Sequence, residues 1–136
     1  MTFPLSGTYA GNLKVDLSHH LSQTSLTTAA SIEDQGDGSS FSPTDLVAVA
    51  LGSCILTVLG IVAARHQINL EGTQFTAEKQ MSNEPRRIGK IVLNFEMPAG
   101  LAPKKRKLLE HSAHACPVSK SLHPDLEKEF RFHYPD

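Results

Sequence analysis

The chain has 136 residues, of which 40% are hydrophobic and 20% charged, with 13 Lys and Arg against 14 Asp and Glu. This length predicts a single domain over residues 1–136, and the composition is typical of a folded soluble protein. A formal net charge of -1 gives no bulk attraction toward nucleic acid or an anionic membrane, so we expect neither as a partner. Two cysteines are too few for a disulfide-built secreted scaffold, and the first residues lack the pattern of a signal peptide. We therefore expect a cytoplasmic protein with reduced thiols.

The N-terminal third predicts β structure. Leu13, Val15 and Leu17 alternate with polar residues, as in a strand with one dry face, and residues 8–12 (TYAGN) before them are typical of a turn. The Thr-rich run over residues 21–31 predicts a second strand. Residues 33–43, rich in Gly, Ser and Asp, predict an exposed loop that leads to a helix.

A long apolar helix is predicted next. Ser42 suits the N-cap, Pro43 suits the first helical position, and Asp45 places a negative charge in the first turn. Residues 46–64 carry no charge, which satisfies the length criterion for a membrane span. Amphipathic strands on both sides, and small or polar residues inside the run, favour the core of a soluble fold instead.

A helix that is apolar on all sides must be surrounded by other structure. One chain of this length can hardly enclose it alone, so we expect an obligate homodimer. Gly52 and Gly60 are expected to let a second backbone approach closely.

The C-terminal half predicts a β-hairpin, two helical pieces and a closing strand. Residues 73–82 and 87–98 predict the hairpin, and a helix is expected from Pro103 to Ala115, with Pro117 starting a shorter one. Alternating Phe130, Phe132 and Tyr134 predict the closing strand. The basic run Lys104, Lys105, Arg106 and Lys107 is interpreted as a solvated helix face rather than a nucleic-acid site, because no interleaved aromatic residues accompany it.

The reactive side chains are few. Cys54 lies in the middle of the apolar helix, and Cys116 lies at the break between the two later helical pieces. Buried free cysteines are common in cytosolic proteins, so an inert pair is one interpretation. The alternative is a redox pair, because a helix that begins at Pro117 would point free N–H groups at the Cys116 sulfur and favour its thiolate. Either sulfur could then capture the sulfenic acid of the other.

A metal site is a weaker hypothesis. His111 and His114 share a helix face close to Cys116, which could make a partial set of ligands. A structural zinc requires four ligands in fixed geometry, so we expect no metal or bound cofactor. The sequence also lacks a phosphate-binding glycine loop, a GxSxG elbow and an HExxH helix.

Two segments together resemble the OsmC/Ohr family of osmotically induced and organic hydroperoxide resistance proteins. They are FSPTDLVAVALGSC, residues 41–54, and ACPVSKSL, residues 115–122. The resemblance extends over most of the chain. It implies an α+β fold and an intertwined homodimer, in which bent antiparallel sheets wrap around the long central helices of both subunits.

The resemblance also implies a chemistry. In the active members of the family the helix cysteine attacks the peroxide and the cysteine of the CP motif resolves the product, which assigns these roles to Cys54 and Cys116. The expected substrate is an organic hydroperoxide, and the expected reductant is an external dithiol. The peroxidase members carry a Glu after the helix-starting proline and an Arg from the N-terminal strands. Here Thr44 occupies the first position, Asp45 follows it, and Lys14 is the basic residue available in place of the Arg.

The leading hypothesis is therefore a thiol-dependent peroxidase that uses Cys54 and Cys116, with Thr44, Asp45 and Lys14 as supporting residues. The alternative is a non-enzymatic OsmC-like dimer that binds an apolar small molecule at the subunit interface.

Overall fold

The computed structural model describes residues 3–136. Their contacts gather in two compact units, one ending at Val47 and the other beginning at Ala48. The division falls inside the first helix, and the expectation of one domain over residues 1–136 stays a prediction.

The N-terminal unit contains an antiparallel sheet in the order β1-β2-β3. Its strands are β1 (Leu5–Gly11), β2 (Lys14–His19) and β3 (Thr24–Ala29). The prediction of β structure is confirmed, since Val15 and Leu17 are half-buried on one face of β2.

The predicted turn over residues 8–12 is wrong, because most of that segment belongs to β1. The actual turn is formed by Asn12 and Leu13, which have positive φ angles of 56° and 62° and follow Gly11 at 87°. The β1–β2 register shifts between Tyr9 and Gly11, as at a β-bulge. Leu13, predicted as a strand residue, therefore lies in the turn. The prediction failed because the alternation of apolar residues includes Leu13 and gives no sign of the bulge.

The loop over residues 33–43 is confirmed apart from a short 3-10 helix, η1 (Ile32–Asp34). Helix α1 (Pro43–Arg65) follows and continues into the C-terminal unit. That unit also contains the strands β4 (Gln74–Ser82), β5 (Arg87–Glu96) and β6 (Glu127–His133). Between β5 and β6 lie α2 (Pro103–Ser112), η2 (Ala113–Ala115) and α3 (Pro117–Ser121).

The second sheet has the order β4-β5-β6, and it combines two kinds of pairing. Strands β4 and β5 form the predicted antiparallel hairpin, whereas β6 runs parallel to β5. The antiparallel arrangement expected for the sheets thus holds for every pair except this one. The reason is the connection, since the helical segment between β5 and β6 carries the chain back to the same end of the sheet, as parallel pairing requires.

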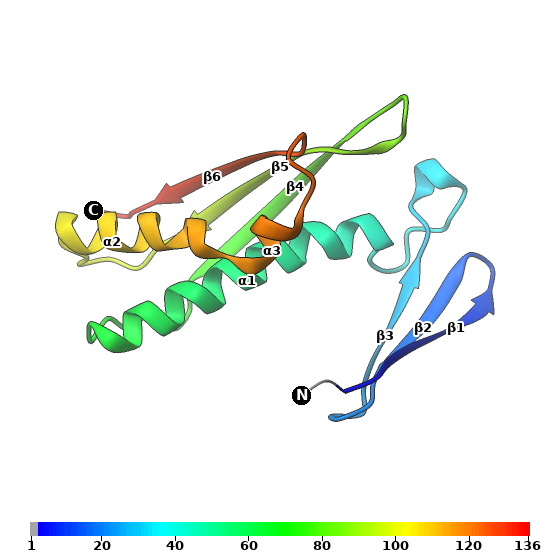
Figure 1. The fold of residues 1–136 in the computed structure, drawn as a ribbon, viewed down its shortest axis with the longest axis horizontal. Coiled ribbons are helices and arrows are strands. Elements are labelled where there is room, and N and C mark those ends of the chain that lie inside the picture. The colour runs from blue at the N-terminus through cyan, green and yellow to red at the C-terminus, as the bar shows by residue number, and fades with distance from the viewer. Residues whose placement is uncertain (1–2) are drawn as a thin grey trace. The chain divides into compact units, whose positions relative to one another are not determined.

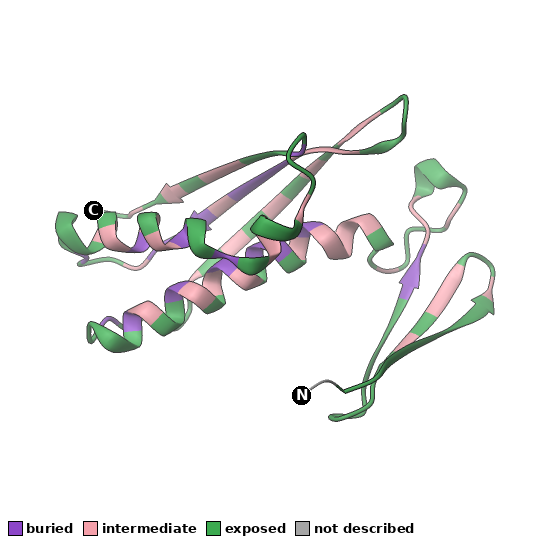
Figure 2. Ribbon diagram, viewed as in Figure 1, coloured by how far each residue is buried: buried purple, intermediate pink, exposed green. Residues whose placement is uncertain are grey.

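The core of the C-terminal unit lies between α1, α2 and the sheet, with α1 along one sheet face (Figure 1). Its fully buried side chains are Leu51, Ile55, Leu59, Ile91, Leu93, Phe95 and Leu109. Figure 2 shows the same interior as the purple bands on β5 and α1. The structure is thus α+β, as expected.

Helix α1 is long and apolar enough to cross a membrane by length and composition alone, a test that the core helix of a soluble protein also passes. Its buried side chains pack against a sheet, which is the arrangement of a core helix. The opposite face is exposed and consists mainly of small residues, namely Ala50, Ser53, Thr57, Gly60, Ile61 and Ala64. We call these residues the small-residue face.

The prediction that Gly52 lets a second backbone approach closely is wrong. A Cβ atom at Gly52 would lie 2.3 Å from the Phe75 ring of β4, so this glycine makes room for an aromatic side chain of its own chain. A Cβ atom at Gly60 would meet nothing within 4 Å, which leaves this position open.

Candidate active site

The first turn of α1 is closed by a reciprocal pair of hydrogen bonds. The Asp45 N–H donates to Ser42 Oγ at 3.1 Å, and the Ser42 N–H donates to Asp45 Oδ2 at 2.9 Å. This is a capping box with Asp in place of the usual Glu or Gln. The predicted N-cap is confirmed, and Asp45 has a structural role at the helix start. Thr44 Oγ1 lies 3.3 Å from Ser42 Oγ in the same cluster.

Lys14 forms an ion pair in the same N-terminal unit. Its Nζ lies 3.0 Å from Asp37 Oδ2. The hydroxyl of Ser39 and the Lys14 ammonium lower the pKa of Asp37 from 3.8 to about 2. The Asp37 carboxylate, which belongs to the exposed loop, therefore balances the charge of Lys14.

The two cysteines meet, although 62 positions separate them in the sequence. Both belong to the C-terminal unit and both are free thiols, and the Cys54 thiol lies close enough to Cys116 to raise the pKa of that residue. Cys54 is half-buried on α1, whereas Cys116 is fully buried. Cys54 is thus the more accessible of the two residues, and Cys116 is enclosed by protein.

Cys116 is the N-cap of α3, as the sequence predicts. Its Sγ accepts a hydrogen bond from the N–H of Ser119 at 3.4 Å. That bond favours the thiolate, but burial and then the neighbouring Cys54 thiol raise the pKa of Cys116 above 9.0. The expectation that the helix start favours the Cys116 thiolate is therefore wrong in its net effect, because desolvation outweighs the hydrogen bond.

The metal hypothesis is not supported by the geometry. Across residues 3–136, no three His, Cys, Asp or Glu side chains are grouped so that they could hold a metal ion. The His114 ring packs against Phe130 with a centroid distance of 5.8 Å, and the Cys116 sulfur faces Cys54.

A cavity of about 390 Å³ is lined by residues that lie close to both cysteines in the chain. Val58 and Val62 form one wall, and they follow Cys54 at intervals of four residues, so all three share one strip of α1. Ala115, the residue before Cys116, lines the other side with His111 and His114. Sequence reasoning did not identify these lining residues, because valine within an apolar helix gives no signal that distinguishes a cavity wall from the core.

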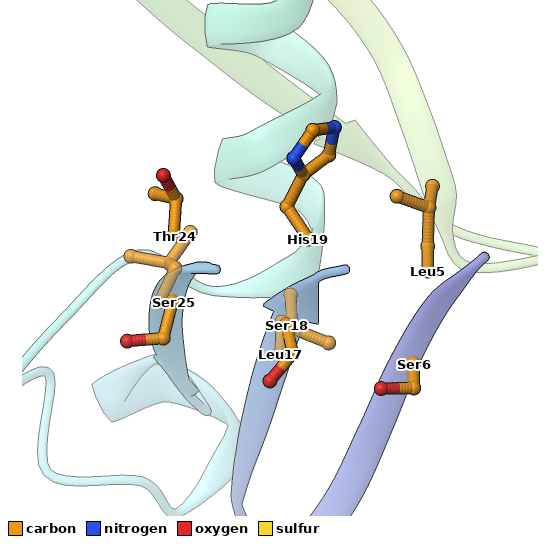
Figure 3. Close-up of a pocket in the computed structure, with 8 residues that line it drawn as sticks. Leu5, Ser6, Leu17, Ser18, His19, Thr24 and Ser25 are labelled. Carbon is orange, nitrogen blue, oxygen red and sulfur yellow. The ribbon is translucent and has the colours of Figure 1, made fainter. Parts of the chain in front are cut away.

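A second hollow lies on the N-terminal sheet (Figure 3). It has a volume of about 340 Å³, and its walls include Leu5, Leu17, Leu26 and His19. The His19 ring is fixed by Ser22, whose Oγ lies 2.6 Å from Nδ1. This hollow is apolar and contains no thiol.

Known structures resemble this chain over nearly its whole length. A protein of Psychrobacter arcticus, named for an osmotic stress induced and detoxification response, is 35% identical with a TM-score of 0.93, covering 98% of this chain and 97% of that one. An organic hydroperoxide resistance protein OsmC of Legionella pneumophila is 20% identical with a TM-score of 0.77, covering 97% and 96%. An OsmC-like protein of Mycoplasma pneumoniae is 13% identical with a TM-score of 0.81, covering 98% and 97%.

No curated protein matches the chain. Residues 36–129 match the family of OsmC-like proteins, and this range includes α1, β4, β5 and both cysteines. With that match and the 35% identity over almost the full length, the chain belongs to the OsmC-like family.

Proposed function

We propose that this protein is a cytoplasmic thiol-dependent peroxidase that reduces organic hydroperoxides with Cys54 and Cys116. Membership of the OsmC-like family supports a peroxidase-like or stress-response role, and the structural relative from Legionella is named for organic hydroperoxide resistance. The observation that carries the proposal is the proximity of one half-buried cysteine to one fully buried cysteine.

The reaction balances with one oxidant and one reductant. The Cys54 thiolate attacks the hydroperoxide, forming an S–O bond as the O–O bond breaks, and the departing alkoxide takes a proton to become an alcohol. The Cys116 sulfur then attacks the Cys54 sulfenic acid, which forms the disulfide and releases water. An external dithiol returns both cysteines to thiols and is itself oxidised to a disulfide.

The assignment of roles follows from exposure. A peroxide must reach the attacking sulfur, and Cys54 is the thiol that solvent reaches. The resolving thiol needs only to be close, and Cys116 is held in place by Ser119 behind it. Of the supporting residues, Asp45 and Lys14 already have structural partners in Ser42 and Asp37, so we propose that activity depends chiefly on the two sulfurs.

We also propose that the protein is a homodimer. The small-residue face of α1 is exposed, and exposed apolar side chains on the N-terminal sheet include Leu5 at 73% and Tyr9 at 64%. Apolar surface of this extent is typical of an interaction site. A second copy would cover it.

The test is peroxide consumption by the reduced protein with cumene hydroperoxide and dithiothreitol. We expect steady turnover by the wild type and loss of nearly all of it in Cys54→Ser. Without dithiothreitol, Cys116→Ser should consume one equivalent of peroxide and then accumulate the Cys54 sulfenic acid, because no second protein thiol is there to form the disulfide. Ser53→Ala, a neighbour of Cys54 that removes no thiol, is the matched control. Equal and negligible consumption by wild type and Cys54→Ser would refute the peroxidase and leave the non-enzymatic binding protein.

A further inference from the structure

Strand β6 turns one of its faces toward the segment that carries Cys116. Lys128, Phe130 and Phe132 alternate along the strand, so their side chains leave it on the same side. Phe132 stacks on the fully buried Phe95 ring with a centroid distance of 4.9 Å, which identifies this side as the one that faces the core. Lys128 and Phe130 therefore also point inward from β6.

These two inward side chains contact the chain on either side of Cys116. The Phe130 and His114 rings lie 5.8 Å apart, centroid to centroid, and His114 comes two residues before the cysteine. The Lys128 Nζ donates a hydrogen bond to Ser119 O at 3.0 Å, three residues after the cysteine. Because β6 is anchored in the core, both contacts tie the segment around Cys116 to a fixed strand.

Helix α3 needs such support because it is short. It has five residues, whereas isolated helices of fewer than about 12–15 residues are marginal in water. At its N-terminal end the Cys116 Sγ accepts the N–H of Ser119 at 3.4 Å. Toward its C-terminal end the Ser119 carbonyl accepts Lys128, in addition to the N–H of Leu122 at 3.4 Å. A lysine at this end of a helix satisfies a terminal carbonyl and suits the helix dipole.

Ser119 thus connects Lys128 to the sulfur of Cys116. Its N–H donates to the sulfur, and its carbonyl accepts from the lysine. The N–H groups of Ser119 and Val118 favour the Cys116 thiolate, although burial first and then Cys54 raise the pKa of Cys116 overall. If α3 frayed, the sulfur would lose these N–H groups and the position that they give it.

The Lys128 ammonium has no competing ion pair. Across residues 3–136 it contacts no carboxylate, whereas Lys90 on β5 pairs with Glu129 at 3.3 Å. The β5–β6 register and the alternation along each strand place Lys90 and Glu129 on the opposite face of the sheet from Lys128. The charges of that face are therefore balanced among themselves, and Lys128 remains with the α3 carbonyl.

We infer that Lys128 is a positioning residue for Cys116: acting through Ser119, it keeps α3 folded and the sulfur placed to attack the Cys54 sulfenic acid. The inference rests on the proposed function, since it assigns Lys128 to the second step of that reaction. In this step the S–S bond forms as the S–O bond breaks, and the departing hydroxide takes the Cys116 proton to become water. Negative charge develops on the Cys116 sulfur as its proton leaves, and the N–H groups at the start of α3 stabilise it.

A single-turnover experiment separates the two steps. The reduced full chain receives one equivalent of cumene hydroperoxide without dithiothreitol, and peroxide loss and Cys54–Cys116 disulfide formation are followed together. Since Lys128 is exposed, Lys128→Met should slow disulfide formation by about threefold, the scale of one exposed charged contact. The rate of peroxide loss should not change. Dimedone should label more Cys54 than in the wild type, because the sulfenic acid persists longer.

Two further variants are the controls. Lys128→Arg keeps a charged donor that can reach the Ser119 carbonyl, so disulfide formation should return to the wild-type rate. Lys90→Met removes an ammonium and its Glu129 contact from the other face of the same sheet. It should form the disulfide as fast as the wild type.

Hydrogen exchange of the Ser119 amide tests the positioning without any peroxide. This N–H is protected only while α3 is folded, so it should exchange faster in Lys128→Met and at the wild-type rate in Lys128→Arg and Lys90→Met. If the wild type consumes no peroxide, the proposed peroxidase fails. Faster exchange in Lys128→Met would then still uphold the support of Cys116 by Lys128.

Three results would overturn the inference. Unchanged exchange of the Ser119 amide in Lys128→Met would show that α3 stays folded without the lysine. Faster exchange with disulfide formation at the wild-type rate would show that this support does not affect the attack by Cys116. Equal slowing of both steps in Lys128→Met, or equal slowing of disulfide formation in Lys90→Met, would reduce the role of Lys128 to general stability.

Discussion

The two thiols are chemically identical in the sequence but have different surroundings in the fold. Cys116 is fully buried and lies behind the half-exposed Cys54. Removing a thiol from water disfavours its charged form, and a second sulfur nearby adds to that effect. We therefore expect Cys116 to remain a neutral thiol until the Cys54 sulfenic acid forms beside it.

The ionisation of Cys116 provides a test at this scale. Its pKa should lie above 9.0 in the reduced wild type and fall in Cys54→Ser, because that variant removes the neighbouring thiol but keeps the burial. The ¹³Cβ chemical shift of Cys116 followed over pH reports the value. An unchanged titration in Cys54→Ser would show that the sulfurs do not influence each other.

The same shift links pH to stability. Because the folded pKa is raised, the thiol contributes stability at pH values below the unfolded pKa, and the contribution is lost as pH rises through the folded pKa. Above about pH 9, the free energy of unfolding should fall more steeply for the wild type than for Cys116→Ser. Parallel slopes in urea denaturation at several alkaline pH values would contradict this.

Gly52 is important because it has no side chain. A Cβ atom there would meet the Phe75 ring at 2.3 Å, so Gly52→Ala should destabilise the fold by about 1–3 kcal/mol, as overpacking does. Chemical denaturation measures the loss. Adding Phe75→Leu should recover part of it by removing the clashing ring, and strictly additive losses in the double variant would refute the clash.

At the scale of elements, the start of α1 is determined by four consecutive residues. Ser42 and Asp45 exchange hydrogen bonds, and Pro43 supplies a backbone suited to the first helical position. The same segment occupies the place where the resemblance to peroxidases led us to expect a catalytic carboxylate. Asp45 caps the helix, and a catalytic role in addition would show in activity rather than in stability.

Two substitutions distinguish these roles. Ser42→Ala should lower the free energy of unfolding by about 0.5–2 kcal/mol, the usual cost of losing an N-cap. Asp45→Asn keeps an oxygen that accepts the Ser42 N–H, so we expect a smaller loss and nearly unchanged peroxide consumption. A large fall in kcat for Asp45→Asn with little change in stability would instead assign the carboxylate to catalysis.

For the whole molecule, the exposed small-residue face of α1 predicts a second copy. Light scattering on the reduced protein should give about twice the chain mass of 14.8 kDa. Ile61, 53% exposed on that face, is the position to disrupt. Ile61→Asp should shift the protein toward monomer because a buried, unpaired charge is costly, while Gln74→Asp on exposed β4 should not. A wild-type mass of one chain would contradict the dimer.

The elements that the sequence predicted well are those with strong local signals. The Ser42–Pro43 start, the uncharged run of α1, the hairpin around its turn and the break at Pro117 depend on residues close together in the chain. The β1–β2 turn and the parallel pairing of β6 were not predicted. A bulge changes register without changing the apolar alternation, and pairing direction depends on the whole path between two strands.

By itself, the sequence determined the family resemblance, the fold class and the two cysteines as the candidate pair, because motifs and periodicity are local properties. Only the tertiary structure decided that Cys54 and Cys116 are neighbours, that one is half-buried and the other enclosed, and that Phe75 fills the space at Gly52. It also confirmed that Lys104, Lys105 and Lys107 are exposed, as a solvated helix face requires. Burial, desolvation and contact depend on residues distant in the chain, and these meet only when the helices and the sheet pack together.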